Sequence, residues 1–451
     1  MLTSSFADLT TLDPQAALDD LEFLRDLAGD ARVVAIGESA HYAHEFYLLR
    51  HRLTRFLVER LGFTAIAFES GFPEAWLTDE WIRGGPGDLA RVQSAGLTYL
   101  FGECAEMGAM LTWLRELNTK STSMINKGQP PAGPRPVRFY GIDLPASCGS
   151  LQPALRAAAQ YLALADPAQA TRLARLQELA ASYVSADPRC DSEVRRAMAA
   201  YCARPRAERD ELTGLLADLT ARFDAVALQY RERTGDEAFD LAAQHLRVAR
   251  QLDTWLRDNA TAAAGEHPFF DINIRDASMA QTVRWILARE ERLVILAHNL
   301  HIQRTPYGLS WLSEDGAASE ASSLGHHLAT SLGRAYRVIG TTFRAGEVVG
   351  VDPGTSSDAD ATGWNVRDVV RRLGPADPDS VDGLLASARD TPGALDLRTL
   401  TPADAALLGG PRPMRSLDQY IDVPVTAAYD ALVHVPEVTL WHSPAMPVLL
   451  Q

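Results

Sequence analysis

The amino-acid sequence predicts an α/β protein with a mainly parallel central sheet, flanked by helices and carrying a helical insertion that forms a lid or side lobe. Apolar runs at residues 32–36 and 64–68 are each followed by a segment of helical periodicity. Continuous apolar strands that alternate with helices are typical of a parallel sheet covered on both faces. Residues 152–264 are rich in Ala, Leu, Arg and Glu and lack β-branched runs, which predicts the helical insertion.

The predicted elements follow one another along the chain. An amphipathic helix at 18–27 precedes the first strand, and a second helix at 45–59 ends before Gly62, a residue type favoured at helix C-caps. The strand at 64–68 leads into a helix at 73–83 that opens with a proline. Later apolar runs predict further strands at 137–140, 293–296, 336–339 and 431–435. Stretches rich in Gly, Pro and small polar residues are predicted as loops at 118–136 and 349–378.

We expect three parts in this chain. Residues 1–150 form the N-terminal part of the α/β core and carry loops with Glu and His residues. Residues 151–264 form the helical insertion and contribute the substrate cleft, and residues 265–451 complete the core.

Composition excludes several classes of protein. The 451 residues carry a formal net charge of −15, which argues against a nucleic-acid-binding face because such a face needs clustered Lys and Arg. No signal peptide is evident, and no apolar stretch reaches the ~18 residues of a membrane span. The four cysteines include no Cys-x-x-Cys pair, as expected in a reducing compartment. We therefore expect a cytoplasmic protein with neither nucleic acid nor membrane as a partner.

Chemically active residues follow four of the predicted strands. Ligands of parallel sheets bind beyond the carboxyl ends of the strands, because loops converge there. The residues at these ends are Glu38, His41, Glu69, Asp143, His298 and His301. Asp143 taken alone is more typical of a helix cap than of a catalyst. Glu69 directly follows an apolar run, so its carboxylate needs a partner in the interior.

Two arginines are expected to point inward and to need partners. Arg50 lies on the apolar stripe of its helix, which makes it the predicted partner of Glu69. The other interpretation of Arg50 is a structural ion pair that holds the helix to the sheet. Arg275 and Asp276 lie four and three residues before the apolar set that begins at Met279, so they too are expected to face the interior.

The histidine spacings leave a metal site open. His41 and His44, like His298 and His301, are three residues apart. Together with Glu38 and Glu69 they could hold a divalent ion, although His-x-x-His is common by chance. Nucleophile-elbow, Walker A, dinucleotide-binding and His-Glu-x-x-His motifs do not occur. What remains is hydrolysis by water activated on His and Glu, with or without a metal.

The motifs at these strand ends resemble those of the erythromycin esterase family. The resemblance extends from about residue 32 to residue 435, and the insertion is aligned by position only. The matching segments are Ile36-Gly37-Glu38-Ser39-Ala40-His41, Glu45–His51, Leu61–Phe63 with Ala67–Phe72, Gly141-Ile142-Asp143, Arg275-Asp276 with Met279-Ala280, and Ala297-His298-Asn299 with His301-Ile302-Gln303.

The resemblance implies hydrolysis of the macrolide lactone ester and hence resistance to erythromycin-type antibiotics. By motif, His41 would be the general base that deprotonates water, with Glu38 and His298 orienting or polarising the reacting groups. Arg50 and Glu69 would complete the charged pocket. The expected substrate-binding residues are His301, Arg275 and Asp143. The family also implies that neither a covalent serine intermediate nor a metal is required, so we expect no cofactor and only a macrolide and water as partners.

Two alternatives stay open at this point. One is a metal-dependent hydrolase of another ester or amide, in which His41, Glu38, Glu69 and His298 would be the metal ligands. The other is a non-catalytic protein that binds a bulky apolar ligand or an iron compound at the charged cluster.

Overall fold

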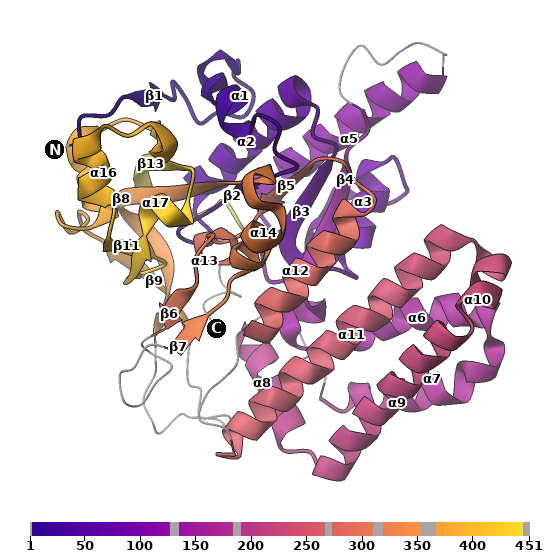
Figure 1. The fold of residues 1–451 in the computed structure, drawn as a ribbon. Coiled ribbons are helices and arrows are strands. Elements are labelled where there is room, and N and C mark those ends of the chain that lie inside the picture. The colour runs from indigo at the N-terminus through magenta and orange to yellow at the C-terminus, as the bar shows by residue number, and fades with distance from the viewer. Residues whose placement is uncertain are drawn as a thin grey trace.

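The computed structural model describes most of the chain, and Figure 1 shows its arrangement. The described residues are 2–126, 135–183, 191–266, 273–309, 319–352 and 367–444. Cys190, one of the four cysteines, lies outside them. Among these residues, no helix is both long and apolar enough to cross a membrane.

The strands fall into one large sheet and two small hairpins within the described residues. Their bounds are β1 Phe6–Asp8, β2 Val33–Ile36, β3 Ala65–Gly71, β4 Arg138–Asp143, β5 Leu293–Leu296, β6 Tyr307–Leu309, β7 Ser319–Ala321, β8 Tyr336–Asp352, β9 Arg367–Leu373, β10 Gly393–Asp396, β11 Pro411–Ser416, β12 Gln419–Pro424 and β13 Ala431–Val438.

Helices surround the sheet and form the insertion. Their bounds are α1 Phe23–Ala28, α2 His44–Leu61, α3 Ala75–Ile82, α4 Leu89–Ala95, α5 Ala105–Asn126, α6 Gln152–Ala165, α7 Ala170–Ala181, α8 Asp191–Cys202, α9 Arg206–Ala225, α10 Ala227–Thr234, α11 Asp236–Ala263, α12 Asn273–Leu287, α13 Asn299–Ile302, α14 Leu324–Leu332, α15 Val381–Ala388, α16 Pro402–Leu408 and α17 Val425–Ala428. As predicted, Gly62 caps α2 in the left-handed conformation, with φ of 73°.

The central sheet is mixed but mainly parallel, so the predicted α/β class is confirmed. Among the described residues its strand order is β1-β10-β13-β8-β2-β5-β3-β4, and β9 pairs with β8. The six strands from β13 to β4 are mutually parallel, while β1, β9 and β10 pair antiparallel. The strand β5 therefore lies between β2 and β3, although it follows them by more than 200 residues in sequence.

Alternate side chains of the inner strands pack on opposite faces of the sheet. In β2, Val34 and Ile36 join a core with helices α1, α2 and α5, whereas Val33 and Ala35 join a core with α12, α14 and α15. All four side chains are completely buried. This two-sided burial explains why the inner strands are apolar throughout.

The insertion consists of helices α6 to α11, which form a lobe beside the sheet (Figure 1). These helices have an apolar core of their own, whose members include Leu155, Leu176, Leu216 and Leu252. Helix α12 contacts both α11 and β4, so it lies between the lobe and the sheet.

Both predicted loops are wrong in part. Helix α5 continues to Asn126, and its Thr119, Lys120, Thr122 and Ser123 are exposed, so the polar composition belongs to a solvated helix face and not to a loop. The second stretch contains the end of β8 and all of β9, which form an antiparallel pair. The valines of β9 stand among arginines, and the glycine and proline content of the stretch did not reveal the pair of strands. Residues 127–134 and 353–366 of the two stretches lie outside the described residues.

Candidate active site

Four neighbouring strands bring the predicted site residues to one edge of the sheet. The strands β2, β5, β3 and β4 are adjacent and parallel, so the segments after their carboxyl ends meet. Glu38 and His41 follow β2, Glu69 lies within the last residues of β3, Asp143 ends β4, and His298 comes two residues after β5.

The turn after β2 requires a glycine because another side chain occupies the space beside it. A Cβ atom on Gly37 would lie 2.0 Å from Asn299 Oδ1. The amide of Asn299 is itself fixed, since its Nδ2 donates to the carbonyl oxygen of Thr341 at 2.8 Å and its Oδ1 accepts from the backbone N–H of Thr341. The close approach sets the direction in which the chain leaves β2 toward Glu38.

Glu38 contacts two of the other predicted site residues, His41 and Arg50. Its Oε1 lies 2.7 Å from His41 Nδ1, and its Oε2 lies 2.8 Å from Arg50 Nη2. The predicted partnership of Arg50 with Glu69 is therefore wrong, because Arg50 is paired with Glu38. The guanidinium of Arg50 also stacks near the rings of Tyr47 and Phe68, at 5.0 and 5.5 Å.

Glu69 contacts three other predicted site residues, Arg275, His298 and His301. Its Oε1 lies 3.2 Å from both Arg275 Nη2 and His301 Nε2, and its Oε2 accepts the backbone N–H of His298 at 2.8 Å. Burial alone raises the pKa of Glu69, but the charges of His301 and Arg275 hold it well below its usual range. Glu69 is thus a fixed negative charge in the interior.

Asp143 binds Arg275 rather than capping a helix. Both carboxylate oxygens accept from the guanidinium, with a shortest distance of 2.6 Å. Burial lowers the pKa of Arg275, but Asp143 more than offsets this and raises it well above its ordinary value. As expected from the sequence, Arg275 points inward, with 17% of its side chain exposed, and the neighbouring Asp276 is completely buried.

His301 is held as a cation between two carboxylates. Its Nδ1 lies 2.8 Å from Asp276 Oδ1 and its Nε2 lies 3.2 Å from Glu69 Oε1. Burial lowers the pKa of His301, but Asp276 and Glu69 raise it to about 10. Both ring nitrogens therefore carry protons at neutral pH, so His301 cannot accept another.

His298 is held in the opposite state. Its Nδ1 accepts the backbone N–H of Leu300 as the N-cap of α13, and its Nε2 lies 3.3 Å from the carbonyl oxygen of Ser39. Burial and the neighbouring His41 hold the pKa of His298 well below its ordinary value. His298 is a neutral imidazole that donates from Nε2.

His41 is the histidine of this group that reaches the surface. Its side chain is 22% exposed, and its Nε2 has no hydrogen-bond partner among the described residues. The ring packs 5.1 Å from Phe101 and 4.9 Å from the ring of His298, measured between centroids. Three histidines at one site are thus a fixed cation, a fixed neutral donor and one accessible ring backed by a carboxylate.

A carboxylate, an accessible histidine and buried cationic groups are the parts that ester hydrolysis needs. The sequence model of the erythromycin esterase family matches residues 58–438, which is most of the chain. The chain belongs to the erythromycin esterase family. The resemblance seen in the strand-end motifs is confirmed, and this member of the family is a carboxylic ester hydrolase.

Individual relatives agree with this assignment. The chain is 29% identical over 345 residues to the erythromycin esterase type II of Escherichia coli, with 75% of each chain covered. It is 27% identical over 437 residues to the type I enzyme of the same organism, with 94% of this chain and 96% of the relative covered. A mutant of the erythromycin esterase EreC, solved in its open conformation, shares the fold with a TM-score of 0.76 at 24% identity over 97% of this chain and 98% of that one.

The ligand set of the metal-dependent alternative is engaged in other contacts. Glu38 and Glu69 use their oxygens for the contacts described above, and His298 uses Nδ1 as a helix cap. His44 does not join His41, because its Nδ1 faces Glu106 from the start of α2. Among the described residues, the one group with metal-ligand geometry consists of His44, Glu106 and His442.

Sequence reasoning missed three contributors to this cluster of charged residues. Asp276 was predicted to point inward but not to be the partner of His301. Tyr307, which was not predicted at all, donates to Asp276 Oδ2 at 3.2 Å. The backbone carbonyl of Ser39 was also missed. The spacing of Asp276 from Met279 was a usable signal for its burial, whereas a carbonyl oxygen has no signature in sequence.

A large cavity lies away from these residues. It has a volume of about 1330 Å³ and is bounded by α3, α4, α6 and α11, with Glu74, Trp76 and His245 in its lining. None of the site residues named above lines it. The substrate cleft predicted for the insertion stays a prediction.

Proposed function

We propose that this esterase opens the lactone ring of erythromycin-type macrolides, with His41 as the base that deprotonates the attacking water. The observation that carries this proposal is the 2.7 Å contact of His41 Nδ1 with the buried Glu38, on a ring whose other nitrogen is accessible. A carboxylate at Nδ1 keeps the proton there, leaves Nε2 as the acceptor and stabilises the imidazolium that forms.

The proposed reaction has two steps. Water attacks the lactone carbonyl carbon while its proton passes to His41 Nε2, and the carbonyl oxygen becomes an oxyanion. The bond from that carbon to the ring oxygen then breaks, and the departing alkoxide takes the proton back from His41. One water is consumed, and the carboxylic acid and hydroxyl products remain in one molecule because the ester is part of a ring.

His298 is the proposed donor to the oxyanion. Its neutral state leaves a proton on Nε2, which the carbonyl of Ser39 holds at 3.3 Å, and its ring lies next to that of His41. A substrate carbonyl could take the place of that weak acceptor, and a donor aimed at developing charge typically contributes 10²–10³ in rate, or roughly 3 kcal/mol. Arg50 keeps the Glu38 carboxylate in place, and Glu69 holds the main chain at His298.

We further propose that His301, Arg275 and Asp143 line the substrate pocket and that the enzyme confers macrolide resistance. Arg275 is the most exposed of the three, at 17%. We also propose that the enzyme is cytoplasmic and has neither nucleic acid nor membrane as a partner, and the formal net charge of −15 argues against a basic face for nucleic acid. The site contains its own base and cations, so we propose that turnover needs no metal or other cofactor.

Mass spectrometry of erythromycin incubated with the purified enzyme tests the proposal. We expect the mass of one water to be gained, with and without EDTA, and the gain to be lost in His41→Asn. His326→Ala is the matched control, because His326 lies on α14 and contacts Ser322 rather than the site. Turnover by the His41 variant at the wild-type rate would refute the mechanism.

Other outcomes would distinguish the alternative functions. Turnover that EDTA abolishes and Zn²⁺ restores would indicate a metal-dependent hydrolase. Erythromycin binding without turnover, unaffected by the His41 substitution, would indicate a binding protein. No binding and no turnover for any macrolide would overturn the proposed substrate, and a panel of other esters and lactones would then be tested.

A further inference from the structure

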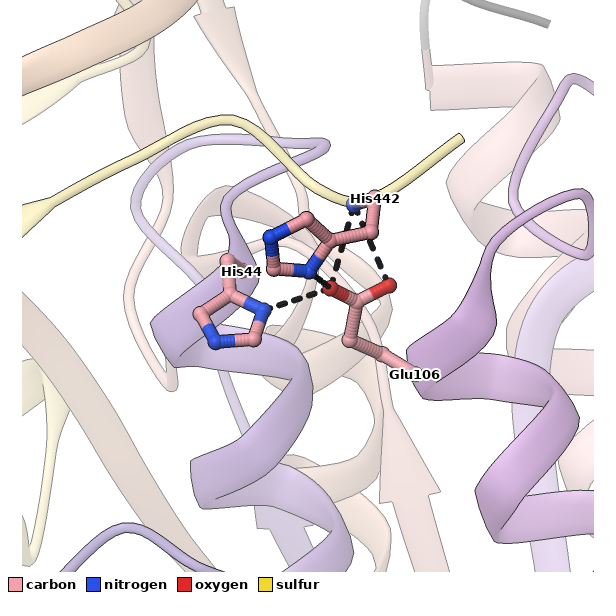
Figure 2. Close-up of side chains that lie close together, drawn as sticks. All are labelled: His44, Glu106 and His442. Carbon is pink, nitrogen blue, oxygen red and sulfur yellow. Dashed lines mark hydrogen bonds and ion pairs between the residues drawn. The ribbon is translucent and has the colours of Figure 1, made fainter. Parts of the chain in front are cut away.

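A second group of side chains that can bind a metal includes His44, three residues after His41, and is not part of the candidate active site. His44 is the first residue of α2, Glu106 lies in the first turn of α5, and His442 follows β13 (Figure 2). Glu106 Oε1 is 2.5 Å from His44 Nδ1 and 2.7 Å from His442 Nδ1. The three residues can offer one ligand atom each, all within 4.8 Å of one another.

Hydrogen bonds of the main chain help to hold these three residues in place. The backbone N–H of His44 donates to the carbonyl oxygen of Thr439 at 2.8 Å, and the N–H of Ala105 donates to the carbonyl oxygen of His442 at 3.0 Å. The N–H of His442 in turn donates to the Glu106 carboxylate at 3.1 Å. Because the backbones are fixed, little has to be ordered when a ligand binds.

The carboxylate of Glu106 is in hydrogen-bond contact with the two imidazoles. Its side chain is 3% exposed, and no Lys or Arg among the described residues forms a salt bridge with it. A buried carboxylate needs compensation, and both Nδ1 atoms converge on the same oxygen to provide it. A single cation at that point would interact with all three groups at once.

The donor set and its geometry suit a divalent transition metal. Two imidazoles and a carboxylate are ligands that Zn²⁺ binds at about 2.0–2.2 Å. Tetrahedral coordination separates ligand atoms by about 3.3 Å, so the present nitrogen–oxygen distances need to open by less than about 1 Å. His442 is 68% exposed, which leaves room for a water molecule as the fourth ligand.

We propose that His44, Glu106 and His442 bind one divalent transition metal ion, Zn²⁺ by ligand chemistry, which fastens the C-terminal segment to α2 and α5. The site is separate from the catalytic histidine, whose Nδ1 is bound to Glu38. The proposal goes beyond hydrolysis and does not depend on it.

Equilibrium dialysis of the untagged, EDTA-treated enzyme against Zn²⁺, followed by elemental analysis, tests the site. We expect about one Zn²⁺ per chain for the wild type. Glu106→Gln and His442→Ala should each lose it, whereas His326→Ala, the matched loss of a histidine elsewhere, should keep it. Wild-type enzyme that retains no Zn²⁺, or equal binding by all four proteins, would overturn the proposal.

A melting experiment provides the second readout and guards against misfolded variants. Zn²⁺ at 100 times its dissociation constant should raise the Tm of the wild type by about 3 °C, and that of His442→Ala not at all. If the Tm of the two proteins responds equally to Zn²⁺, the cluster is only a hydrogen-bonded contact. Erythromycin turnover measured in parallel keeps the two proposals distinguishable, because removal of this ion should leave the catalytic contacts in place.

Discussion

Glu38→Gln gives the sharpest test of the proposed mechanism, because it changes one atom and leaves the shape of the side chain. Glu38 contacts His41 Nδ1 at 2.7 Å and Arg50 Nη2 at 2.8 Å. A guanidinium can only donate, so the glutamine carbonyl should turn toward Arg50 and its NH₂ group toward His41. The Nδ1 of His41 must then accept, which moves the ring proton to Nε2 and removes the base.

The expected loss follows from that change of tautomer. The same exchange of a carboxylate for an amide behind a catalytic histidine costs about 10⁴ in kcat in serine proteases. At 1.36 kcal/mol per factor of ten, this corresponds to about 5 kcal/mol of transition-state stabilisation. The opposite amide orientation would place two donors 2.8 Å apart at Arg50 and is therefore disfavoured.

The assay is ring opening of erythromycin, or of the ester identified by screening, followed by mass spectrometry, with circular dichroism as a check of folding. Glu290→Gln is the matched control, because Glu290 accepts a hydrogen bond from Tyr140 at 2.6 Å and lies outside the site. The control should keep kcat within about threefold of the wild type. A folded Glu38→Gln enzyme with more than about a tenth of wild-type kcat would refute the tautomer argument.

Three further predictions concern the neighbouring charges. The pKa of His301 is about 10 in the folded state against about 6.5 unfolded, so its contribution to stability is complete below pH 6.5 and is lost as the pH rises through 10. Denaturant unfolding should show a loss of up to about 1.4 kcal/mol per pH unit in that window, and His301→Gln should flatten this slope. His41→Asn should lower kcat by about 10³ with little change in Tm, because the ring is partly exposed; an unchanged kcat would contradict its role as base. Asp143→Asn should lower the free energy of unfolding by about 3 kcal/mol, since the guanidinium of Arg275 stays buried with less compensation. Asp8→Asn is the control, because it breaks the ion pair of Arg389 with a carboxylate that is 81% exposed, and it should change the free energy of unfolding by less than about 1 kcal/mol. Equal losses of stability in the two variants would refute the burial argument.

The inner sheet could be predicted from the sequence because its strands are buried on both faces. Residues 33–36 are all apolar and completely buried, and the same is true of residues 293–296. The outer strands give no such signal. Residues 367–373 of β9 combine arginines with valines at an edge of the sheet. Two of the three residues of β1 are partly buried, and the third is exposed. Short or one-sided strands resemble loops in composition.

The convergence of the candidate site's side chains could be predicted, but their pairings could not. Strand ends identify which side chains converge, whereas the pairing depends on which strands are neighbours. The insertion of β5 between β2 and β3 places His298 and His301 next to Glu69. Arg50 lies on the helix that follows β2, so it reaches Glu38 instead. The order of the strands is a tertiary property and leaves no trace in local periodicity.

The balance of charge at the site argues for His41 as the group that changes protonation. Four carboxylates, Glu38, Glu69, Asp143 and Asp276, face three cations, Arg50, Arg275 and His301. One negative charge is therefore left over, and it adjoins His41 through Glu38. A proton taken up by His41 makes the buried network neutral, which lowers the cost of forming the imidazolium beside buried charges. The same network disfavours a second proton on His298. A charged His298 would lie next to the positive charge on His41, because the centroids of the two rings are 4.9 Å apart. One histidine can thus gain and return a proton while its neighbours keep theirs, as general-base hydrolysis requires.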